Sequence, residues 1–294
     1  MTDARTLTLA LGGQWYGRYG LAFCPAHVNR RTPALSLSTG TDGRFLAHCH
    51  AGCTFAEIVG AMLGRGILRG GGDHAASGPA ALARRQAEDM AAAEKRARQA
   101  ERLWRESLNI AGTLAEAYLR GRGITCPLPD ALRFHPECWH PAARRFPAMV
   151  AFVDGADGFA VHRTYLAPDG AGKAAVDPAK AMLGGVAGGA VRLTEGPGRL
   201  VVAEGIETAL SLASGLLRGP ATIWAALSTS GMAGLRLPDL PGRLTIAPDG
   251  DAAGREAAHA LAERAHALGW IVSLLPAPDG RDWNDVICMK GGDA

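Results

Sequence analysis

Three short apolar runs in the last third of the chain, each followed by acidic residues, constrain its fold most strongly. The runs are residues 200–203, 244–248 and 270–275, and the acidic groups behind them are Glu204, then Asp249 with Asp251, then Asp282 with Asp285. Each run is leucine-rich or β-branched and is bounded by Gly or Pro, which is typical of a buried strand. Helical patterns at Glu207–Leu217 and Gly254–Leu268 separate the runs. This alternation predicts a parallel sheet with helices on both faces.

The acidic groups all fall at the carboxyl ends of the predicted strands, where parallel sheets bind their ligands. Carboxylates gathered at one edge repel each other, and a divalent cation relieves that repulsion. Oxygen-only ligands suit Mg²⁺ or Mn²⁺. Asp249 and Asp251 stand two residues apart on a turn, so both can face one ion. The alternative is a turn with solvated acids at a helix N-terminus, but Glu204 and Asp282 on neighbouring strands favour a metal site.

The order Glu-Gly, Asp-Gly-Asp-x-Ala-Gly and a late acidic pair resembles the Toprim domain of bacterial-type DNA primases, of type IA and II topoisomerases and of some nucleases. Residues 204–210 are most similar to the phage and plasmid branch of the primases. The resemblance implies a Rossmann-like parallel sheet, Glu204 as acid/base or metal ligand, and Asp249, Asp251 and Asp282 as ligands of Mg²⁺ or Mn²⁺. Cellular primases usually carry an Asp where this chain has Thr208. Whether Glu207 takes that role stays open, as does the role of Asp285.

A second strong motif lies near the N-terminus. Cys24 and His27 form a Cys-x2-His pair, and Cys49 and Cys53 form a Cys-x3-Cys pair after 21 intervening residues. Two such pairs, separated by the length of a β-hairpin, predict a structural zinc ribbon with a closed tetrahedral shell. The alternative is a set of core thiols, and His48 or His50 could replace a ligand. The module resembles the zinc-binding domain that precedes the catalytic domain in bacterial-type primases. This resemblance implies that the module helps to read the template, whose phosphates Arg30, Arg31 and Arg44 could contact.

Composition shifts divide the chain into four predicted parts. Residues 1–63 form the β-rich zinc ribbon, which a short helix from Phe55 to Leu63 closes, and residues 64–108 form a linker. The linker begins with a Gly-rich and Ser-rich stretch up to Pro79 and continues as a charged, mostly solvated helix from Ala80 to Leu108. Residues 109–199 are predicted to be an α+β subdomain, and residues 200–294 the Toprim domain. The predicted fold class is therefore α/β with an N-terminal zinc ribbon.

The α+β subdomain resembles the N-terminal part of the primase catalytic core. The stretches that carry this resemblance are residues 118–124, 163–166 and 180–184. Strands are expected near residues 132–135, 148–153, 159–166, 179–184 and 190–193. The resemblance implies that basic residues here hold nucleotide and template phosphates. By position we nominate Arg163, Lys173 and Lys180, together with Arg120 and Arg122 as template contacts; for each, a plain surface charge is the alternative.

The remaining metal-ligand candidates form a poorer pattern. Cys126 and Cys138 with His140 could build a second zinc site, but their spacing is irregular and the prolines between residues 127 and 141 suggest an ordered loop. Core thiols are the simpler interpretation. His259 and His266 are expected on a helix surface.

Charge and hydrophobicity narrow the functional classes. The net charge is +3 and hydrophobic residues make up 48% of the chain, which permits a core, and no apolar run approaches the roughly 20 residues that span a bilayer. Without a secretory segment, we expect a cytoplasmic protein with no membrane partner, and the six cysteines then indicate metal ligands or free thiols. Arg and Lys concentrate between Arg84 and Lys180, which suits a polyanion held beside an acidic metal centre.

The leading hypothesis is a small DNA primase of a mobile element, a nucleotidyltransferase that makes primers on single-stranded DNA from NTPs. Structural Zn²⁺ and catalytic Mg²⁺ or Mn²⁺ are the expected cofactors, and a separate replicative helicase is a further candidate partner. One alternative is a Toprim-type metal-dependent nuclease that uses the same carboxylates. Another is a non-catalytic protein that binds single-stranded DNA or an origin. A topoisomerase is disfavoured, because the chain lacks room for a separate cleavage domain with its tyrosine.

Overall fold

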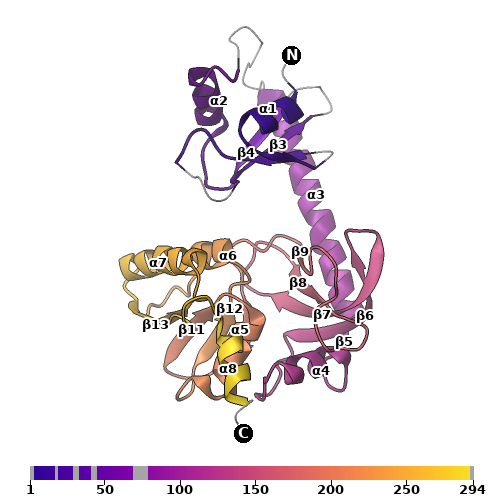
Figure 1. The fold of residues 1–294 in the computed structure, drawn as a ribbon, viewed down its shortest axis with the longest axis vertical. Coiled ribbons are helices and arrows are strands. Elements are labelled where there is room, and N and C mark those ends of the chain that lie inside the picture. Colours follow the sequence, from indigo (N-terminus) through magenta and orange to yellow (C-terminus); the bar gives the residue numbers. More distant parts are fainter. Residues whose placement is uncertain (1–2, 17–18, 29–32, 41–44, 69–78, 292–294) are drawn as a thin grey trace. The chain divides into compact units, whose positions relative to one another are not determined.

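The computed structural model describes residues 3–16, 19–28, 33–40, 45–68 and 79–291, with only the backbone for residues 79–86. The predicted hairpin turn at residues 41–43, the arginines Arg30, Arg31 and Arg44, and the glycines at 70–72 lie outside these ranges. By its internal contacts the chain divides into two compact units, residues 1–82 and 83–294 (Figure 1). This division does not test the four-part organisation expected from the sequence, which stays a prediction.

The N-terminal unit is built on an antiparallel sheet with strand order β1-β2-β3-β4. Its elements are α1 (Ala4–Ala10), β1 (Gln14–Trp15), β2 (Tyr19–Ala22), β3 (Leu35–Thr39), β4 (Phe45–Cys49) and α2 (Phe55–Gly64). The predicted hairpin is present as β3 and β4, paired from Leu35 with Cys49 to Thr39 with Phe45. Thr54 starts α2 with a reciprocal capping box to Glu57. The sequence analysis did not identify α1, β1 or β2.

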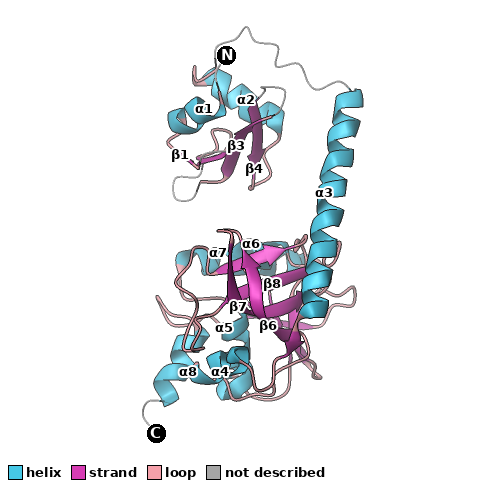
Figure 2. Ribbon diagram, turned by 90° about the vertical axis from the view of Figure 1, so that its right-hand side faces the viewer, coloured by secondary structure: helices cyan, strands magenta, loops and turns pink. Residues whose placement is uncertain are grey.

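The second unit begins with the long helix α3 (Pro79–Glu106). Its exposed charges form pairs four residues apart, such as Arg102 with Glu106, as predicted for a solvated helix. Its last turns differ from that prediction, because Ala100 is fully buried and packs with Val150 and Val161. Figure 2 shows this end of α3 against the strands of the first sheet of the unit. The helix is therefore part of the folded unit over its last turns.

The first sheet is antiparallel, with strand order β5-β6-β7-β8-β9. Its strands are β5 (Leu108–Asn109), β6 (Leu132–His140), β7 (Arg144–Val153), β8 (Ala160–Tyr165) and β9 (Lys180–Leu183), and α4 (Leu114–Gly121) precedes β6. Beta strand β6 continues through Pro136, where a shift in the pairing register between His135 and Cys138 accommodates the proline. Part of the ordered loop expected around the prolines is thus a strand.

The second sheet has strand order β10-β12-β11-β13-β14. Its elements are β10 (Val191–Thr194), β11 (Arg199–Ala203), α5 (Ile206–Ser211), an irregular helical turn η1 (Leu212–Leu216), β12 (Thr222–Ala225), α6 (Thr229–Gly234), β13 (Arg243–Ala247), α7 (Ala252–Ala267), β14 (Ile271–Leu274) and α8 (Trp283–Gly291). The pairings of β11, β12, β13 and β14 with one another are parallel. The three predicted strands and the parallel sheet are confirmed.

Two details of this sheet correct the sequence analysis. The segment at residues 190–193 was expected in the α+β subdomain, but β10 pairs antiparallel with β12 at the edge of the second sheet. Strand β12 itself was not predicted. The helices lie on both faces as expected: side chains of α5 join one apolar cluster with Val201 and Ala203, and side chains of α6 and α7 join another with Leu200 and Val202.

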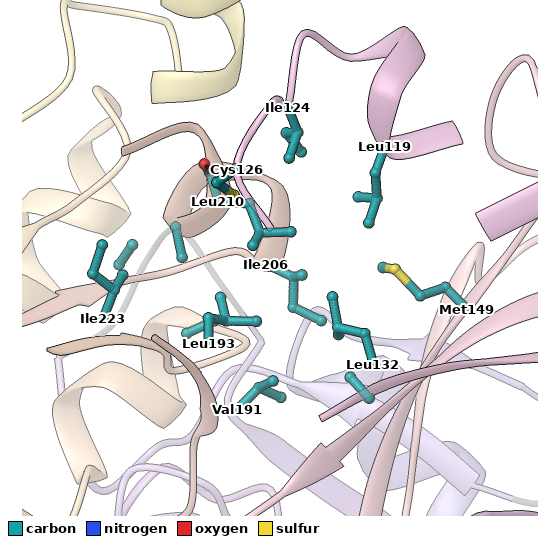
Figure 3. Close-up of a cluster of buried hydrophobic side chains, with 14 of the residues drawn as sticks. Leu119, Ile124, Cys126, Leu132, Met149, Val191, Leu193, Ile206, Leu210 and Ile223 are labelled. Carbon is teal, nitrogen blue, oxygen red and sulfur yellow. Dashed lines mark hydrogen bonds between the residues drawn. The ribbon is translucent and has the colours of Figure 1, made fainter. Parts of the chain in front are cut away.

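One apolar cluster joins the two sheets of the second unit. It combines side chains of α4, β6 and β7, among them Leu119, Leu132 and Met149, with side chains of α5 and β10 such as Ile206 and Leu193. Figure 3 shows these side chains facing one another across the boundary between the two sheets. The shared core fixes the first sheet relative to the second. No helix among the described residues is long and apolar enough to cross a membrane.

Removing a large side chain from this shared core should destabilise the second unit. Leu132 is 1% exposed, so Leu132→Ala leaves a cavity and should lower the free energy of unfolding by about 2–5 kcal/mol. Leu268→Ala is the matched control, because Leu268 is 60% exposed and its loss should change stability by about 0.5 kcal/mol or less. Urea denaturation of both variants measures the difference, and equal stabilities would show that the cluster does not hold the sheets together.

Candidate zinc site and acidic site

The four predicted zinc ligands converge in the N-terminal unit. Cys24 and His27 follow β2, Cys49 ends β4, and Cys53 precedes α2. Their ligand atoms all lie within 4.8 Å of one another, and His27 Nδ1 lies 3.1 Å from Cys53 Sγ and 3.7 Å from Cys49 Sγ. Tetrahedral ligands around zinc stand about 3.5–3.8 Å apart, given bond lengths of about 2.0–2.3 Å. The set therefore fits a closed, structural zinc site.

The electrostatics of the thiols support the same conclusion. Burial, together with the neighbouring sulfurs of Cys49 and Cys24, raises the pKa of the Cys53 thiol to about 12. Three crowded thiols cannot all ionise without a cation among them, whereas zinc binds thiolates and displaces their protons. The alternative ligands His48 and His50 are not in the group; their rings contact each other edge to face with centroids 5.0 Å apart.

The other cysteines do not form a second group of this kind. Cys126 packs in the cluster that joins the two sheets, where its thiol faces the carbonyl of Leu210, while Cys138 packs with Ala148 and Tyr165. The ring of His140 contacts the carbonyl oxygen of Pro178 at 2.9 Å. The two thiols lie in different apolar clusters, and this placement favours core cysteines over a metal site.

The acidic residues of the second unit gather at one edge of its parallel sheet. Strands β11 and β13 pair in register up to Ala203 with Ala247, so Glu204 and the turn from Asp249 to Asp251 leave the sheet side by side. The backbone N–H of Gly250 donates to Arg281 O at 2.7 Å, which ties this turn to the loop that carries Asp282. A Cβ at Gly250 would lie 1.9 Å from the carbonyl oxygen of Pro278. Only glycine permits this close approach.

The pKa values show that these carboxylates affect one another. Burial raises the pKa of Glu204 to about 7, and the charges of Asp249 and Asp251 add to the rise. Burial likewise raises the pKa of Asp249 to about 6, with contributions from Asp282 and Asp251. The ammonium group of Lys180 opposes both shifts. The structure thus brings together the four predicted acidic residues of this site and places one predicted lysine where it affects them.

The arrangement fits an ion that shares its ligands with water and substrate. Among the described residues, only the Cys24 group contains three or more His, Cys, Asp or Glu side chains with ligand atoms within 4.8 Å of one another. The acidic residues are spaced more widely than that. Mg²⁺ is usually held by one or two carboxylates and keeps water or phosphate oxygens for its remaining positions. The carboxylate oxygens and the repulsion between them therefore suit Mg²⁺ or Mn²⁺. The carboxylates lie too far apart to supply all the ligands of one ion.

Two of the acidic residues also start helices. Asp251 Oδ1 accepts a hydrogen bond from the Gly254 amide at 2.7 Å and caps α7. Asp282 Oδ1 accepts from the Asp285 amide at 2.8 Å, and Asp285 Oδ2 accepts from the Asp282 amide at 3.1 Å. The helix-cap alternative for Asp251 is thus also correct. It does not exclude a metal site, because the second carboxylate oxygen of Asp251 can still bind an ion. Asp285 is engaged locally at the start of α8.

Glu207 contacts a different set of residues. Its side chain is 5% exposed and lies 3.6 Å from Lys173 Nζ and 3.2 Å from Lys180 Nζ, and the Tyr118 hydroxyl donates to its Oε1 at 2.7 Å. Burial alone would raise the pKa of Glu207, but Lys180, Lys173 and the tyrosine hydroxyl outweigh it and hold the pKa well below its usual range. Thr208 is the residue of α5 that faces the acidic turn, with Oγ1 3.4 Å from Asp249 Oδ1.

The predicted arginines occupy different environments. Arg163 is 7% exposed, and its two terminal nitrogens donate to the carbonyls of Trp139 and Met182 at 3.0 Å each. Arg120 pairs with Glu116 and donates to the carbonyls of Ile124 and Cys126. These contacts favour structural roles for both, although their predicted phosphate contacts remain untested. Arg122 lies over the Tyr118 ring, close enough to Lys173 to affect its pKa.

Sequence reasoning missed three features of this site. Tyr118 and the buried His162, whose pKa burial and Lys180 lower to about 4, gave no local signal because their partners lie far away in the chain. Leu227, just after β12, has a φ of 73° and donates its amide to Glu204 O at 2.7 Å. A positive φ at a branched residue is strained. The segment after β12 therefore supports the backbone of Glu204.

Comparisons with known proteins agree with this description of the second unit. Residues 199–293 match the family described as Toprim domain, which confirms the Toprim prediction for the second sheet. Residues 94–193 match a domain of unknown function, DUF7146. No curated protein matches the chain.

Several solved structures are similar to the chain. A DNA primase domain from Pseudomonas aeruginosa is 21% identical over 62% of this chain and 69% of that chain, with a TM-score of 0.38. The Aquifex aeolicus primase (zinc-binding and RNA polymerase domains) is 14% identical, with coverage of 100% and 81% and a TM-score of 0.41. The RNA polymerase domain of Mycobacterium tuberculosis primase DnaG is 19% identical, with coverage of 62% and 60% and a TM-score of 0.34. Each TM-score is low, so these likenesses carry no residue roles over to this chain.

Loss of one thiolate should release zinc from the N-terminal unit. The purified chain should hold about one zinc per chain, and Cys49→Ser should lose it and unfold that unit, because zinc supplies folding energy to a small site of this kind. Metal analysis and circular dichroism measure both effects. Cys288→Ser is the control, since Cys288 is exposed on α8. Stoichiometric zinc in a Cys24→Ser, Cys49→Ser double variant would contradict the ligand assignment.

The raised pKa values predict how pH acts on the chain without added Mg²⁺ or Mn²⁺. Glu204 has a pKa of about 7 when folded, against 4.5 as its ordinary value, so between these values the folded chain holds a proton that the unfolded chain has released. Stability should therefore fall as pH rises through this window. Glu204→Gln should match the wild type at pH 4.5 and melt at a higher temperature at pH 8.

The control for this pH series is Glu263→Gln, an exposed carboxylate on α7. Its melting temperature should follow the wild type at both pH values. Addition of Mn²⁺ at pH 8 should raise the melting temperature of the wild type more than that of Glu204→Gln. If the melting temperatures of Glu204→Gln and wild type differ by the same amount at both pH values, ionisation of Glu204 does not destabilise the folded chain.

Proposed function

We propose that this chain is a DNA primase that synthesises short primers on single-stranded DNA by metal-dependent nucleotidyl transfer. The observation that supports this best is the meeting of two opposite charge groups in one compact unit. Glu204, Asp249, Asp251 and Asp282 supply oxygen ligands at the edge of a Toprim sheet, and Lys173 and Lys180 approach from the preceding sheet. A polyphosphate substrate with its cation requires both groups.

The residues divide the work by their chemistry. Asp249, Asp251 and Asp282 would hold Mg²⁺ or Mn²⁺, together with Glu204, which would also accept the proton of the attacking 3′-hydroxyl. The bound ions would supply charge stabilisation for the entering and leaving oxygens. Lys173 and Lys180 would bind the triphosphate of the incoming NTP, and Arg122 would contact the template. The zinc unit would take part in reading the template, and a separate helicase would expose it.

The test is product analysis with the full chain, single-stranded DNA, NTPs or dNTPs, and Mg²⁺ or Mn²⁺. New oligonucleotides that depend on template and metal support the proposal. Shortened template without synthesis would show a Toprim-type nuclease instead, and a gel shift without either product would show a non-catalytic DNA-binding protein. Both of these outcomes overturn the proposal.

Asp249→Asn and Asp251→Asn should each reduce primer synthesis by about 100-fold or more. An amide replaces a full charge on the shared cation, and several kcal/mol of charge stabilisation depend on it; each 1.4 kcal/mol is tenfold in rate. DNA binding should hold or improve, since one negative charge is gone from the site. Gel shifts and primer yields measure the two effects, with Glu263→Gln as the control. Lost activity that merely follows a lower melting temperature would make the cluster structural.

A further inference from the structure

One buried carboxylate collects three partners from the neighbouring sheet and helix. Glu207, on α5, accepts a hydrogen bond from the Tyr118 hydroxyl of α4 at 2.7 Å. Lys180 of β9 lies 3.2 Å from its Oε2, and Lys173, which precedes β9, lies 3.6 Å from its Oε1. We call these four side chains the Glu207 cluster. Because α5 packs on the second sheet and Lys180 belongs to the first, the Glu207 cluster spans the boundary that the shared core closes.

The charges of the Glu207 cluster do not cancel. One carboxylate faces two ammonium groups, which leaves an excess of one positive charge. The carboxylate side chain is 5% exposed, whereas the side chains of Lys173 and Lys180 are 33% and 37% exposed. Both lysines are therefore partly exposed although they pair with a buried carboxylate. The excess positive charge lies between the core and the surface, where a ligand in solvent can contact the lysine side chains.

The excess charge lies beside the acidic site. Lys180 lowers the pKa of both Glu204 and Asp249, so its ammonium group is within electrostatic reach of the predicted metal ligands. Arg122 adds a third cation near Lys173. The buried His162 lies within electrostatic reach of both lysines and adds no further cation near neutral pH, because burial lowers its pKa to about 4.

Both carboxylate oxygens of Glu207 are already engaged by neighbouring side chains. Oε1 receives the Tyr118 hydroxyl and lies against Lys173, and Oε2 lies against Lys180. Thr208, the next residue, is the one that contacts Asp249. A carboxylate that is buried, paired twice and hydrogen-bonded is suited to hold other groups in place rather than to bind a metal.

We propose that Glu207 is a positioning residue that holds Lys173 and Lys180 as a paired cation for the triphosphate of a nucleotide. The inference rests on the proposed function and names the subsite for its substrate. Without the carboxylate, two nearby ammonium groups repel each other, and their long side chains regain the rotamer freedom that the ion pairs remove. Burial also lowers the pKa of Lys173, and Glu207 opposes that shift. Glu207 thus holds the two ammonium groups in place and favours the charged form of Lys173.

The first experiment measures binding without chemistry. Isothermal titration of the full chain with ATP, with inorganic tripolyphosphate and with Mn²⁺ alone compares Glu207→Gln with wild type. Glu207→Gln should weaken ATP and tripolyphosphate binding about tenfold and leave Mn²⁺ affinity within about twofold. Asp249→Asn should show the reverse order, with Mn²⁺ affinity most reduced. A loss of Mn²⁺ affinity in Glu207→Gln as large as in Asp249→Asn would make Glu207 a metal ligand and overturn the proposal.

Two variants separate positioning from folding. Glu207→Asp keeps the charge and should restore a large part of the lost tripolyphosphate affinity. Tyr118→Phe removes one hydrogen bond but keeps the three charges, so its loss should be smaller than that of Glu207→Gln. Thermal melts accompany each measurement. Unchanged tripolyphosphate affinity in a folded Glu207→Gln would show that the Glu207 cluster is only a structural ion group.

A double-mutant cycle tests whether Glu207 acts through the lysines. In the Lys180→Met background, Glu207→Gln should have a much smaller further effect on tripolyphosphate binding than in the wild type. Full additivity of the two losses would contradict the proposal. If Glu207→Gln does not fold, Lys173→Met and Lys180→Met still test the pair, because retention of wild-type affinity by either variant would show that no paired cation is needed.

The kinetic readout separates this proposal from the proposed function. In primer synthesis, Glu207→Gln should raise the KM for NTP about tenfold and change kcat by about threefold or less, since the lysines bind substrate and do not react. Synthesis with an unchanged KM would overturn the role of Glu207 and leave the primase intact. Glu207-dependent tripolyphosphate binding in a chain that makes no primers would overturn the primase and leave the positioning role.

Discussion

Repulsion between carboxylates at the carboxyl edge of β11 and β13 is the constraint on which the second unit depends. Burial and mutual charge raise the pKa of Glu204 and Asp249 to about 7 and 6, so the edge is poorly satisfied by the protein alone. The fold tolerates it in two ways. Backbone bonds between Gly250 and the 280–281 loop hold the acidic turn in place, and Lys180 opposes the charge from the other sheet. The remaining repulsion favours a divalent cation at this edge.

The two sheets of this unit are complementary in charge as well as in shape. The apolar cluster around Leu132, Met149 and Ile206 fixes their relative positions, and this fixes the distance between a lysine-bearing sheet and a carboxylate-bearing sheet. The Glu207 cluster lies on the same boundary, with Glu207 from one side and both lysines from the other. Residues 94–193 and residues 199–293 match separate families. The two parts nevertheless depend on each other, because Lys180 of the first sheet opposes the charge of Glu204 and Asp249 beside the second.

The features that could be predicted from the sequence are those that depend on the order of neighbouring residues. Apolar runs that end in Glu204 or Asp249 define parallel strands and place the acids at one edge, and two spaced ligand pairs define the zinc site. Features that depend on remote partners could not be predicted. The run at β10 reads as a strand, but nothing local shows that it pairs with β12. Arg163 was predicted as an available charge, but the strand alternation does not show that its guanidinium group donates to the carbonyls of Trp139 and Met182. The sequence left the role of Glu207 open, because it does not show that Lys173 and Lys180 lie beside this carboxylate.

The distribution of positive charge bears on the choice between synthesis and hydrolysis. Cleavage of a phosphodiester presents one phosphate to the metal ligands, and a carboxylate cluster with its ions is sufficient for that reaction. A nucleoside triphosphate brings further phosphates, and cationic side chains can bind those of its oxygens that the ions leave free. Two lysines that share a single buried counter-charge keep a net positive charge beside the carboxylates. This positive charge can bind phosphate oxygens in addition to those that the metal ions bind, and it is the feature of the unit that supports the proposal of nucleotidyl transfer over the alternative of hydrolysis.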